Sequence, residues 1–183
     1  ATVIGEPENR VKIGVWGNDE HSGRIKIGNY VLISPGTRIS AANEIIIGDS
    51  VMIANGVYIT DSDWHQMYDR ASRSTDFAPV HIGNNVWLGD RSTVLKGVTI
   101  GENSVVAACA VVSRDVPANV VVAGNPAVVV KELDVTRPMK TRADYFADPE
   151  GQAKFFDGVD KMVLQKNGFL RWLRILLKPS TKD

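Results

Sequence analysis

The stretch from Ile82 to Val112, IGNNVWLGDRSTVLKGVTIGENSVVAACAVV, repeats one pattern every six residues. An aliphatic residue leads each repeat, and a small or β-branched residue follows it four positions later. The lead residues of this stretch are Ile82, Leu88, Val94, Ile100, Val106 and Val112. A helix repeats every 3.6 residues, so a period of six argues against a helical repeat and favours short strands joined by tight turns.

The same pattern occurs twice more, nearer the N-terminus. Its lead residues there are Ile27, Ile33 and Ile39, and then Ile47, Ile53 and Ile59. Three six-residue sides close a triangular coil of eighteen residues, and coils stacked at the strand spacing of about 4.8 Å pair their backbones. We therefore predict an all-β solenoid, a parallel β-helix, over residues 1–133. The predicted stacks are Ile82 over Ile100, Leu88 over Val106, and Val94 over Val112.

This fold carries an expectation for the glycines and has one alternative. The glycines that follow lead residues should occupy turns that need a positive φ or a close backbone approach. The alternative fold is a β-sandwich with accidental spacing, and the unbroken run of matches argues against it.

Composition narrows the class of protein. The 183 residues fit one domain with a tail, and 44% hydrophobic with 23% charged residues is the balance of a folded protein. Equal numbers of basic and acidic residues, 21 of each, argue against a dedicated nucleic-acid binder. Cys109 is the only cysteine, which excludes an intrachain disulfide. Since no secretory signal and no long apolar run is evident, we expect a cytoplasmic setting.

The hexapeptide register is broken once inside the solenoid. Ile59 and Ile82 are 23 residues apart, which is not a multiple of six, so a loop over about residues 61–79 must be extruded. It begins Asp61-Ser62-Asp63-Trp64-His65 and holds the densest cluster of reactive side chains in the chain. A long loop inside a regular fold is usually functional.

These features together resemble the hexapeptide-repeat acyltransferase superfamily. The resemblance rests on the register, the histidine-bearing loop, the run Ile82–Gly89 and the closing Val122–Ala127, VAGNPA, and it covers about residues 25–133. It is closest in kind to the sugar and polysaccharide O-acetyltransferase branch. It implies a left-handed parallel β-helix, a homotrimer, and acetyl-CoA bound between neighbouring subunits.

His65 is the candidate general base. Acyl transfer from a thioester to a hydroxyl needs a base near neutral pKa, and histidine has that property. The resemblance implies that the loop histidine is the catalytic one, with Asp61 or Asp63 accepting a hydrogen bond from its other ring nitrogen. The alternative is a surface histidine with no role. We expect His81 to lie at the surface or at an interface, and His21 to lie in a polar loop.

The resemblance also places the cofactor. It implies that Ala107, Ala108, Ser113 and Asp90 line the pantetheine arm and that Arg114 and Lys131 meet the phosphates. Trp87 lies at an outward position of its repeat, so we expect it in the groove between subunits. Packing in a tight turn for the alanines, and a solvated surface charge for either cation, are the alternatives. No metal is expected.

The six-residue period ends near Leu133. We predict a linker at 134–141, a helix at 142–166 and a second helix from Phe169 to Lys178, so that residues 134–183 form a linker with two short helices. The second helix has Arg171, Arg174 and Lys178 on one side and apolar residues on the other. We favour docking of its apolar side on protein, and the alternative is a peripheral membrane contact through residues 169–178.

The resulting hypothesis is an acetyl-CoA-dependent O-acetyltransferase that acts on a sugar hydroxyl, of a surface glycan or its precursor, by direct transfer. Alternatives are N-acyl transfer to an amino sugar, acetylation of an antibiotic, a zinc carbonic anhydrase on the same fold, and a solenoid without catalysis. The paired histidine ligands of the anhydrase are absent from the sequence.

Overall fold

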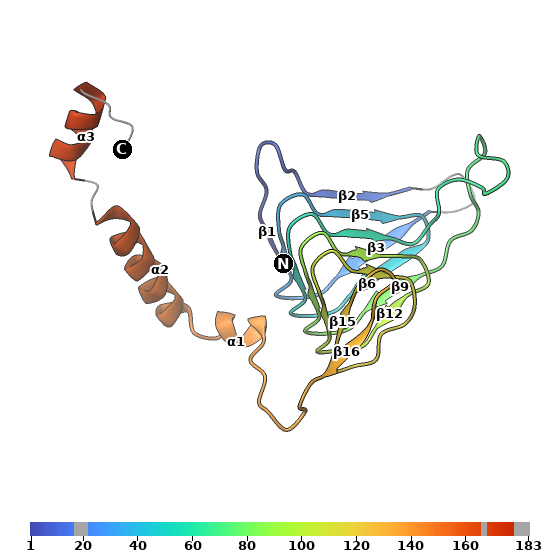
Figure 1. Cartoon of the computed structure of the whole chain (residues 1–183). Helices are drawn as coiled ribbons and strands as arrows, with labels where there is room; N and C mark the ends of the chain where they lie inside the picture. Colours follow the sequence, from blue (N-terminus) through green and yellow to red (C-terminus); the bar gives the residue numbers. More distant parts are fainter. Residues whose placement is uncertain (17–21, 166–167, 178–183) are drawn as a thin grey trace. The chain divides into compact units, whose positions relative to one another are not determined.

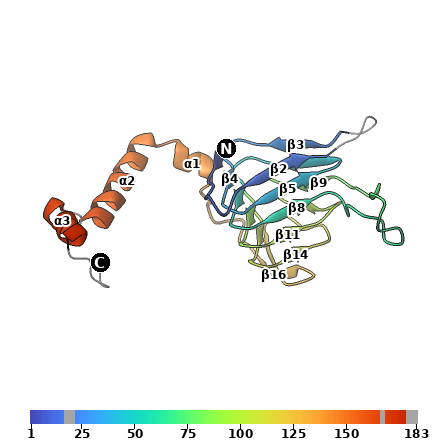
Figure 2. The same cartoon turned by 90° about the horizontal axis from the view of Figure 1, so that it is seen from above.

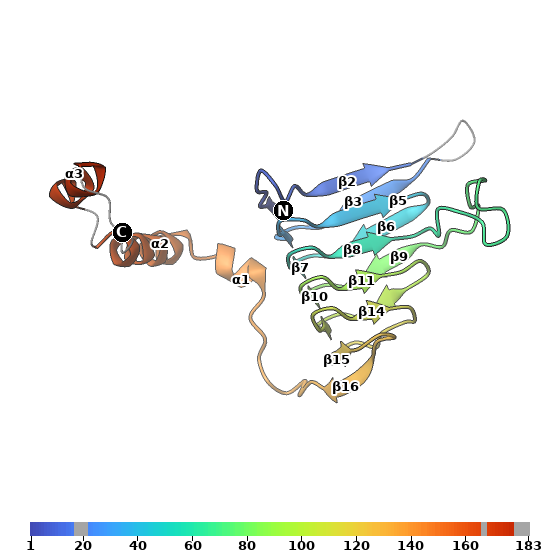
Figure 3. The ribbon, with the colours of Figure 1, turned by 45° about the horizontal axis from the view of Figure 1, so that its top comes forward.

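A computed structural model describes residues 1–16, 22–165 and 168–177. The chain divides into two compact units, Ala1–Ala143 and Asp144–Asp183. The first unit is a triangular prism of stacked coils, drawn from blue to orange in Figure 1, and the parallel stack is clearest in Figure 3. His21 and Lys178 lie outside the described residues.

Three sheets form the sides of the prism, which we call walls A, B and C. Wall A contains β1 (Thr2–Val3), β4 (Leu32–Ile33), β7 (Met52–Ile53), β10 (Trp87–Leu88), β13 (Val105–Val106), β15 (Val120–Ala123) and β16 (Val128–Glu132). Wall B contains β2 (Lys12–Val15), β5 (Arg38–Ala41), β8 (Tyr58–Thr60), β11 (Thr93–Val94) and β14 (Val111–Val112). Wall C contains β3 (Arg24–Ile27), β6 (Glu44–Ile47), β9 (Val80–Ile82) and β12 (Thr99–Ile100).

The predicted stacking register is confirmed. The paired residues are Ile82 with Ile100, Leu88 with Val106, and Val94 with Val112. The register also continues across the extruded loop, because Ile47 pairs with Ile82, and Ile59 pairs with Val94. Only β16 runs antiparallel to its neighbour, β15, among the strands of the described chain.

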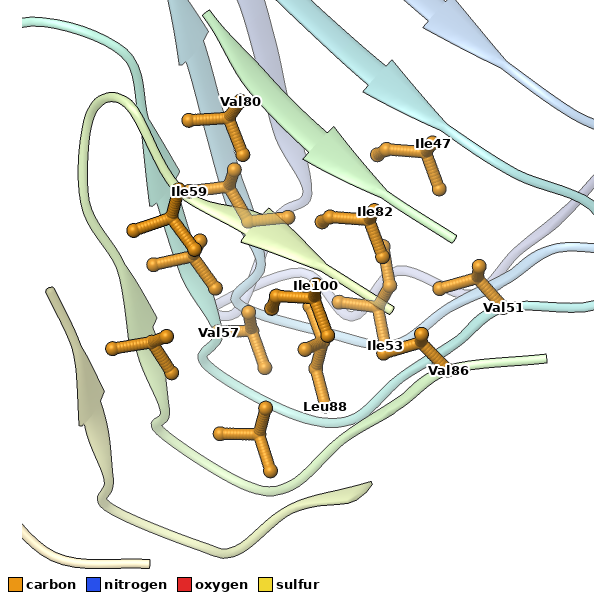
Figure 4. Packing of buried hydrophobic residues seen from close by; sticks show 14 of the residues in the cluster. Ile47, Val51, Ile53, Val57, Ile59, Val80, Ile82, Val86, Leu88 and Ile100 are labelled. Atoms are coloured by element: carbon orange, nitrogen blue, oxygen red, sulfur yellow. The ribbon is translucent and has the colours of Figure 1, made fainter. Parts of the chain in front are cut away.

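The lead aliphatic residues build the core of the prism, as Figure 4 shows from close by. Ile53, Leu88 and Val106 follow one another inside wall A and are each 0% exposed. The small residue four positions after each lead also points inward; Val57, Ser92 and Ala110 are fully buried. Burial of a Leu or Ile side chain contributes roughly 1.5–3 kcal/mol, so stability is distributed along the stack.

Close approach, and not positive φ, explains the glycines that follow lead residues. A Cβ on Gly89 would lie 2.7 Å from the Ala108 nitrogen, and one on Gly101 would lie 2.3 Å from the Ala118 nitrogen. Positive φ falls two residues after these glycines, at Arg91 (+56°) and Asn103 (+60°). The glycines therefore let successive coils touch, while other residues make the turn.

The segment predicted as a linker, residues 134–141, belongs wholly to the first unit, and so do the next two residues, which were predicted as the start of a helix. The side chain of Arg142 donates from Nε to the Tyr30 carbonyl oxygen at 2.8 Å, and the Ala143 N–H donates to Ser50 Oγ at 3.3 Å. These contacts tie residues 142–143 to turns of the prism. They explain why the first unit extends to Ala143.

The second unit holds helices. They are α1 (Arg142–Phe146), which begins in the first unit, α2 (Pro149–Leu164) and α3 (Phe169–Leu177). The single helix predicted over 142–166 is broken at Asp148, whose carboxylate accepts from the Gly151 N–H, because Pro149 cannot continue a helix but suits its first turn. No helix among the described residues is both long and apolar enough to cross a membrane.

Candidate active site

The extruded loop leaves the prism between β8 of wall B and β9 of wall C. Figure 3 shows it projecting from the stack beside the ends of these strands. The loop folds back on itself, since isolated antiparallel bridges join Ser62 to Phe77 and His65 to Arg73. It thereby forms an ordered arm that contains His65.

Lys96 ties the two sides of this arm to the coil beneath it. Its Nζ lies 2.6 Å from Asp63 Oδ2, on the outgoing side, and 2.5 Å from Asp76 Oδ2, on the returning side. Burial alone would lower the pKa of Lys96, but its hydrogen bonds to Asp63 and Asp76 outweigh that effect and raise the pKa above its ordinary value of 10.5. The ammonium group is therefore held in its charged form.

His65 lies on an open cavity of about 460 Å³ formed by the two sides of the loop. The cavity is lined by Asp63, His65, Gln66, Met67, Ser74, Thr75 and Asp76. The His65 N–H donates to the Asp63 carbonyl oxygen at 2.8 Å, which fixes the backbone beside the ring. Within the described residues the imidazole itself has no hydrogen bond or ion pair, so it can accept a proton from a bound molecule.

The two predicted partners of His65 have different surroundings. The Asp61 carboxylate is fully buried and accepts the Ala42 N–H at 2.7 Å and the Asn43 N–H at 2.8 Å. These bonds satisfy backbone donors that the bend after β5 leaves unpaired. Asp63 shares the cavity with His65 and binds Lys96. The contacts support a structural role for Asp61, while Asp63, together with Asp76, lines the cavity that His65 also lines.

Trp64 fixes the base of the loop against wall B. Its indole N–H donates to Tyr58 Oη at 3.1 Å and to Thr60 Oγ1 at 3.0 Å. The backbone of Trp64 has a φ of +62°, a conformation that costs free energy for a bulky side chain. The indole contacts and the Trp64 N–H bond to Ser62 Oγ at 3.1 Å hold that conformation. The residue directly before His65 is thus rigidly placed.

Five of the residues predicted to contact the cofactor lie at the two edges of wall B. Asp90 and Ala107–Ala108 are in successive turns between walls A and B, where the Cys109 N–H donates to the Asp90 carbonyl oxygen at 2.8 Å. A hollow of about 320 Å³ opens at this edge and includes Asp90 and Cys109 in its lining. Ser113 and Arg114 follow β14 at the other edge, the same edge from which the loop emerges after β8.

Trp87 and Lys131 lie on wall A instead. Trp87 is 47% exposed and pairs with Met52 and Val105 in the neighbouring coils. Lys131 is in β16, three strands further along the same wall, where it is paired with Val121 of β15. The structure therefore groups Asp90 with Ala107 and Ala108 at one edge of wall B. Ser113 and Arg114 lie at the other edge, and Trp87 and Lys131 lie on wall A.

His81 has a separate environment on wall C. Its Nε2 lies 3.5 Å from Glu44 Oε1, and Glu44 also binds Arg24. The hydrogen bond from Arg24 is the main cause of the lowered pKa of Glu44, and His81 adds to it. Among the described residues no group of three His, Cys, Asp or Glu side chains could hold a metal ion.

Sequence reasoning missed Lys96, Asp76 and Trp64 as parts of the site. Lys96 follows Leu95 at the corner of the coil below the loop, so its place in the register could have revealed it. Asp76 and Trp64 lie inside the extruded loop, where no register applies and the fold of the arm had to be known.

Comparison with known proteins now defines the class. A family model described as bacterial transferase hexapeptide (six repeats) matches residues 79–114, and one described as hexapeptide repeat of succinyl-transferase matches residues 45–61. Galactoside O-acetyltransferase of Escherichia coli (strain K12) is 37% identical over 121 residues. That alignment covers 65% of this chain, and the chain spans 57% of the length of this curated relative.

Comparison with solved structures points to the same class of enzyme. A maltose O-acetyltransferase from Clostridium difficile 630 is 30% identical with a TM-score of 0.60, over 73% of this chain and 67% of that chain. A galactoside acetyltransferase in complex with coenzyme A is 30% identical with a TM-score of 0.59, over 75% of this chain and 70% of that chain. The chain belongs to the hexapeptide-repeat acetyltransferase superfamily, in its sugar O-acetyltransferase branch, and its fold is a left-handed parallel β-helix.

Proposed function

We propose that the protein is an acetyl-CoA-dependent O-acetyltransferase that acts on a sugar hydroxyl of a surface glycan or its precursor. The observation that carries the proposal is the His65 imidazole, which lines a cavity of about 460 Å³ on a braced loop and has no partner among the described residues. The galactoside and maltose acetyltransferases among its relatives support the sugar, and the coenzyme A complex supports the cofactor.

The proposed reaction is one direct displacement. An imidazole nitrogen of His65 takes the proton of the acceptor hydroxyl while the oxygen attacks the thioester carbonyl carbon. The carbon–sulfur bond breaks, and the thiolate of coenzyme A leaves and takes the proton from the imidazolium. No acyl-enzyme forms. Asp63, which shares the cavity, is the carboxylate that would orient the ring and stabilise the imidazolium.

The cofactor is proposed to lie between neighbouring subunits of a homotrimer, bordered by residues of walls A and B. Asp90, Ala107 and Ala108 offer a small-residue edge beside a hollow of about 320 Å³, which suits a narrow pantetheine arm. Arg114 and Lys131 supply cations for the phosphates, and Ser113 and Trp87 border the path.

Substitution of His65 tests the proposal. His65→Ala should keep coenzyme A binding and lower kcat by about 10²–10⁴-fold, the usual contribution of general base catalysis. His81→Ala is the matched control, because it removes a histidine from wall C and should keep nearly full activity. Turnover in His65→Ala within a few-fold of the original would refute the mechanism. A screen of sugars, amino sugars and antibiotics that follows thiol release separates O-acetylation from the alternative acceptors.

We further propose a cytoplasmic protein, brought to the inner face of the membrane when α3 binds there. In α3 the apolar side chains are exposed, Leu170 by 79% and Leu177 by 70%. Co-flotation of the full chain with anionic phospholipid vesicles, lost in Leu170→Gln/Leu177→Gln, would support this contact. Absence of co-flotation would contradict it and favour docking of α3 on protein.

A further inference from the structure

Wall B differs from the other walls in the charge of its outer surface. The outward residues of successive strands, read down the wall, are Lys12, Arg38, Tyr58, Thr93 and Val111. They include two cations, and the strands of wall B contain no acidic residue. On wall C, by contrast, Arg24 is neutralised by Glu44. Figure 2 shows the strands of wall B one below another along one side of the prism.

Arg38 is held in place but keeps free donors. Its Nε donates to Ser40 Oγ at 3.1 Å, and its Cζ lies 5.1 Å from the ring centre of Tyr58 in a cation–π contact. Among the described residues its terminal nitrogens have no acceptor, and neither has Nζ of Lys12. A planar guanidinium fixed on one side and open on the other is suited to bidentate binding of a carboxylate or phosphate.

Aromatic rings connect this cation to the loop. Tyr58 carries Arg38 on its ring face and accepts the indole N–H of Trp64 at its hydroxyl, 3.1 Å away. Trp16 packs edge-on against Trp64 with ring centres 5.8 Å apart and is itself 49% exposed. Trp64 directly precedes His65. The chain of contacts from Arg38 therefore ends at the proposed base.

Two of these residues, Trp16 and Arg38, border a recess in the wall. It has a volume of about 540 Å³ and is lined by Val11, Lys12, Ile13, Gly14, Trp16, Arg38 and Ser40. Gly14 contributes to its openness, since a Cβ there would meet only the Trp16 indole nitrogen at 3.9 Å. The recess is of the size of a small-ligand site and combines one indole ring, that of Trp16, with two cations.

We infer that the upper part of wall B, made by Lys12, Trp16, Arg38, Tyr58 and Trp64, binds the acceptor, and that this acceptor is a sugar with a carboxylate or phosphate group. The inference rests on the proposed function. The anionic group is bound by Arg38 and Lys12, the apolar face of the sugar ring packs on the indoles, and a hydroxyl at the far end reaches the loop of His65. A neutral sugar leaves both cations unused.

Three acceptors that carry a carboxylate, a phosphate or a hydroxyl group at carbon 6 test the inference. Thiol release from acetyl-CoA is measured for the full chain with methyl glucuronoside, glucose 6-phosphate and methyl glucoside. We expect kcat/KM for at least one anionic sugar to exceed that for methyl glucoside by about tenfold or more. The better of the two anionic sugars identifies the charged group.

Substitutions test whether Arg38 and Lys12 cause the preference for anionic sugars. Arg38→Gln and Lys12→Gln should each raise KM for the preferred anionic sugar by about tenfold and reduce the preference over methyl glucoside. Arg24→Gln, which removes an exposed cation from wall C, is the matched control and should leave the preference unchanged. Equal use of the three sugars, or a preference that persists in Arg38→Gln, would overturn the inference.

A binding measurement separates this inference from the proposed function. Saturation-transfer NMR without acetyl-CoA should detect methyl glucuronoside or glucose 6-phosphate on the original protein and a weaker signal on Arg38→Gln. Binding of this kind without acetyl transfer to any acceptor supports the site and contradicts the proposed activity. Transfer without a charge preference supports the activity and contradicts the site.

Discussion

Ser92 and Ser104 occupy the same position of two hexapeptide repeats, four residues after the leads Leu88 and Ile100. Both are fully buried, yet their hydroxyl groups differ. Ser104 Oγ lies 2.7 Å from the Pro117 carbonyl oxygen and accepts the Val120 N–H at 3.2 Å. Ser92 Oγ has no hydrogen-bond partner in the part of the chain that the structure describes. A buried hydroxyl without a partner costs free energy, while one with two partners stabilises the fold.

The two serines therefore predict opposite responses to the same substitution. Ser104→Ala should lower the free energy of unfolding by about 1–2 kcal/mol, because the Val120 N–H loses its acceptor. Ser92→Ala should be neutral or stabilising by a few tenths of a kcal/mol. Urea denaturation of both variants measures the difference. A destabilised Ser92→Ala would mean that its hydroxyl is satisfied in solution.

At the scale of the element, the arm at 61–79 depends on a contact from outside itself. Lys96 bridges Asp63 and Asp76, which lie on the two sides of the arm. Removal of the ammonium group would leave two carboxylates near one another without a counterion, so the sides should separate. Because His65 lies between them in sequence, its position depends on this bridge.

Lys96→Met should therefore lower kcat by about tenfold and leave coenzyme A binding unchanged, since positioning errors near 1 Å have effects of this order or larger. Lys96→Arg should recover most of the activity, because a guanidinium can contact both carboxylates. Lys26→Met, which removes an exposed cation on wall C, is the control for charge. Full activity in Lys96→Met would show that the loop holds its shape without the bridge.

The same bridge predicts a pH dependence. The pKa of Lys96 is raised in the folded protein, so its contribution to the loop is fully present below the ordinary value of 10.5 and is lost as the pH rises through the folded value. A spin label on the exposed residue 67, as Met67→Cys in a Cys109→Ser background, should gain mobility only above about pH 10.5. In Lys96→Arg the change should move to higher pH. A mobility transition near neutral pH would contradict this assignment.

At the scale of the whole molecule, wall A is the apolar side of the prism. Its outward residues in successive coils are Leu32, Met52, Trp87, Val105 and Val121. An apolar column of this kind favours contact with another protein surface, and a prism can close a threefold ring through such contacts. It supports the proposed homotrimer, with coenzyme A held between subunits.

The trimer is tested on this column. Met52→Lys/Val105→Lys places two charges on wall A without touching the buried leads, so the monomer should keep its fold, as measured by circular dichroism. Sedimentation should then show a shift from trimer to monomer, because unpaired charges in an interface are costly. Thr99→Lys on wall C is the control. A trimer that survives the double substitution would place the interface elsewhere.

The sequence predicted the prism better than the arm, for a physical reason. Each stacked pair, such as Ile82 and Ile100, is separated by the length of one coil, eighteen residues. Because the backbone imposes this spacing on every coil, the sequence alone predicts which residues stack. The prediction for the turns left two reasons open for the glycines, positive φ or close approach; close approach is confirmed, and Arg91 and Asn103 supply the positive φ. Which carboxylate meets Lys96 depends on how the arm folds, and no period governs that segment.

The insertion at 61–79 leaves Ile47 over Ile82 and Ile59 over Val94, as though the chain had not been interrupted. In a scaffold of this kind the stacked coils provide stability and the inserted loop provides the reactive groups. The stack tolerates an insertion at a corner of the prism, provided that the next coil resumes the same register. Reactive arms of different length and composition can therefore be exchanged on one prism without redesign of its interior. Selection can then alter what such a protein modifies while the folding of its framework stays the same.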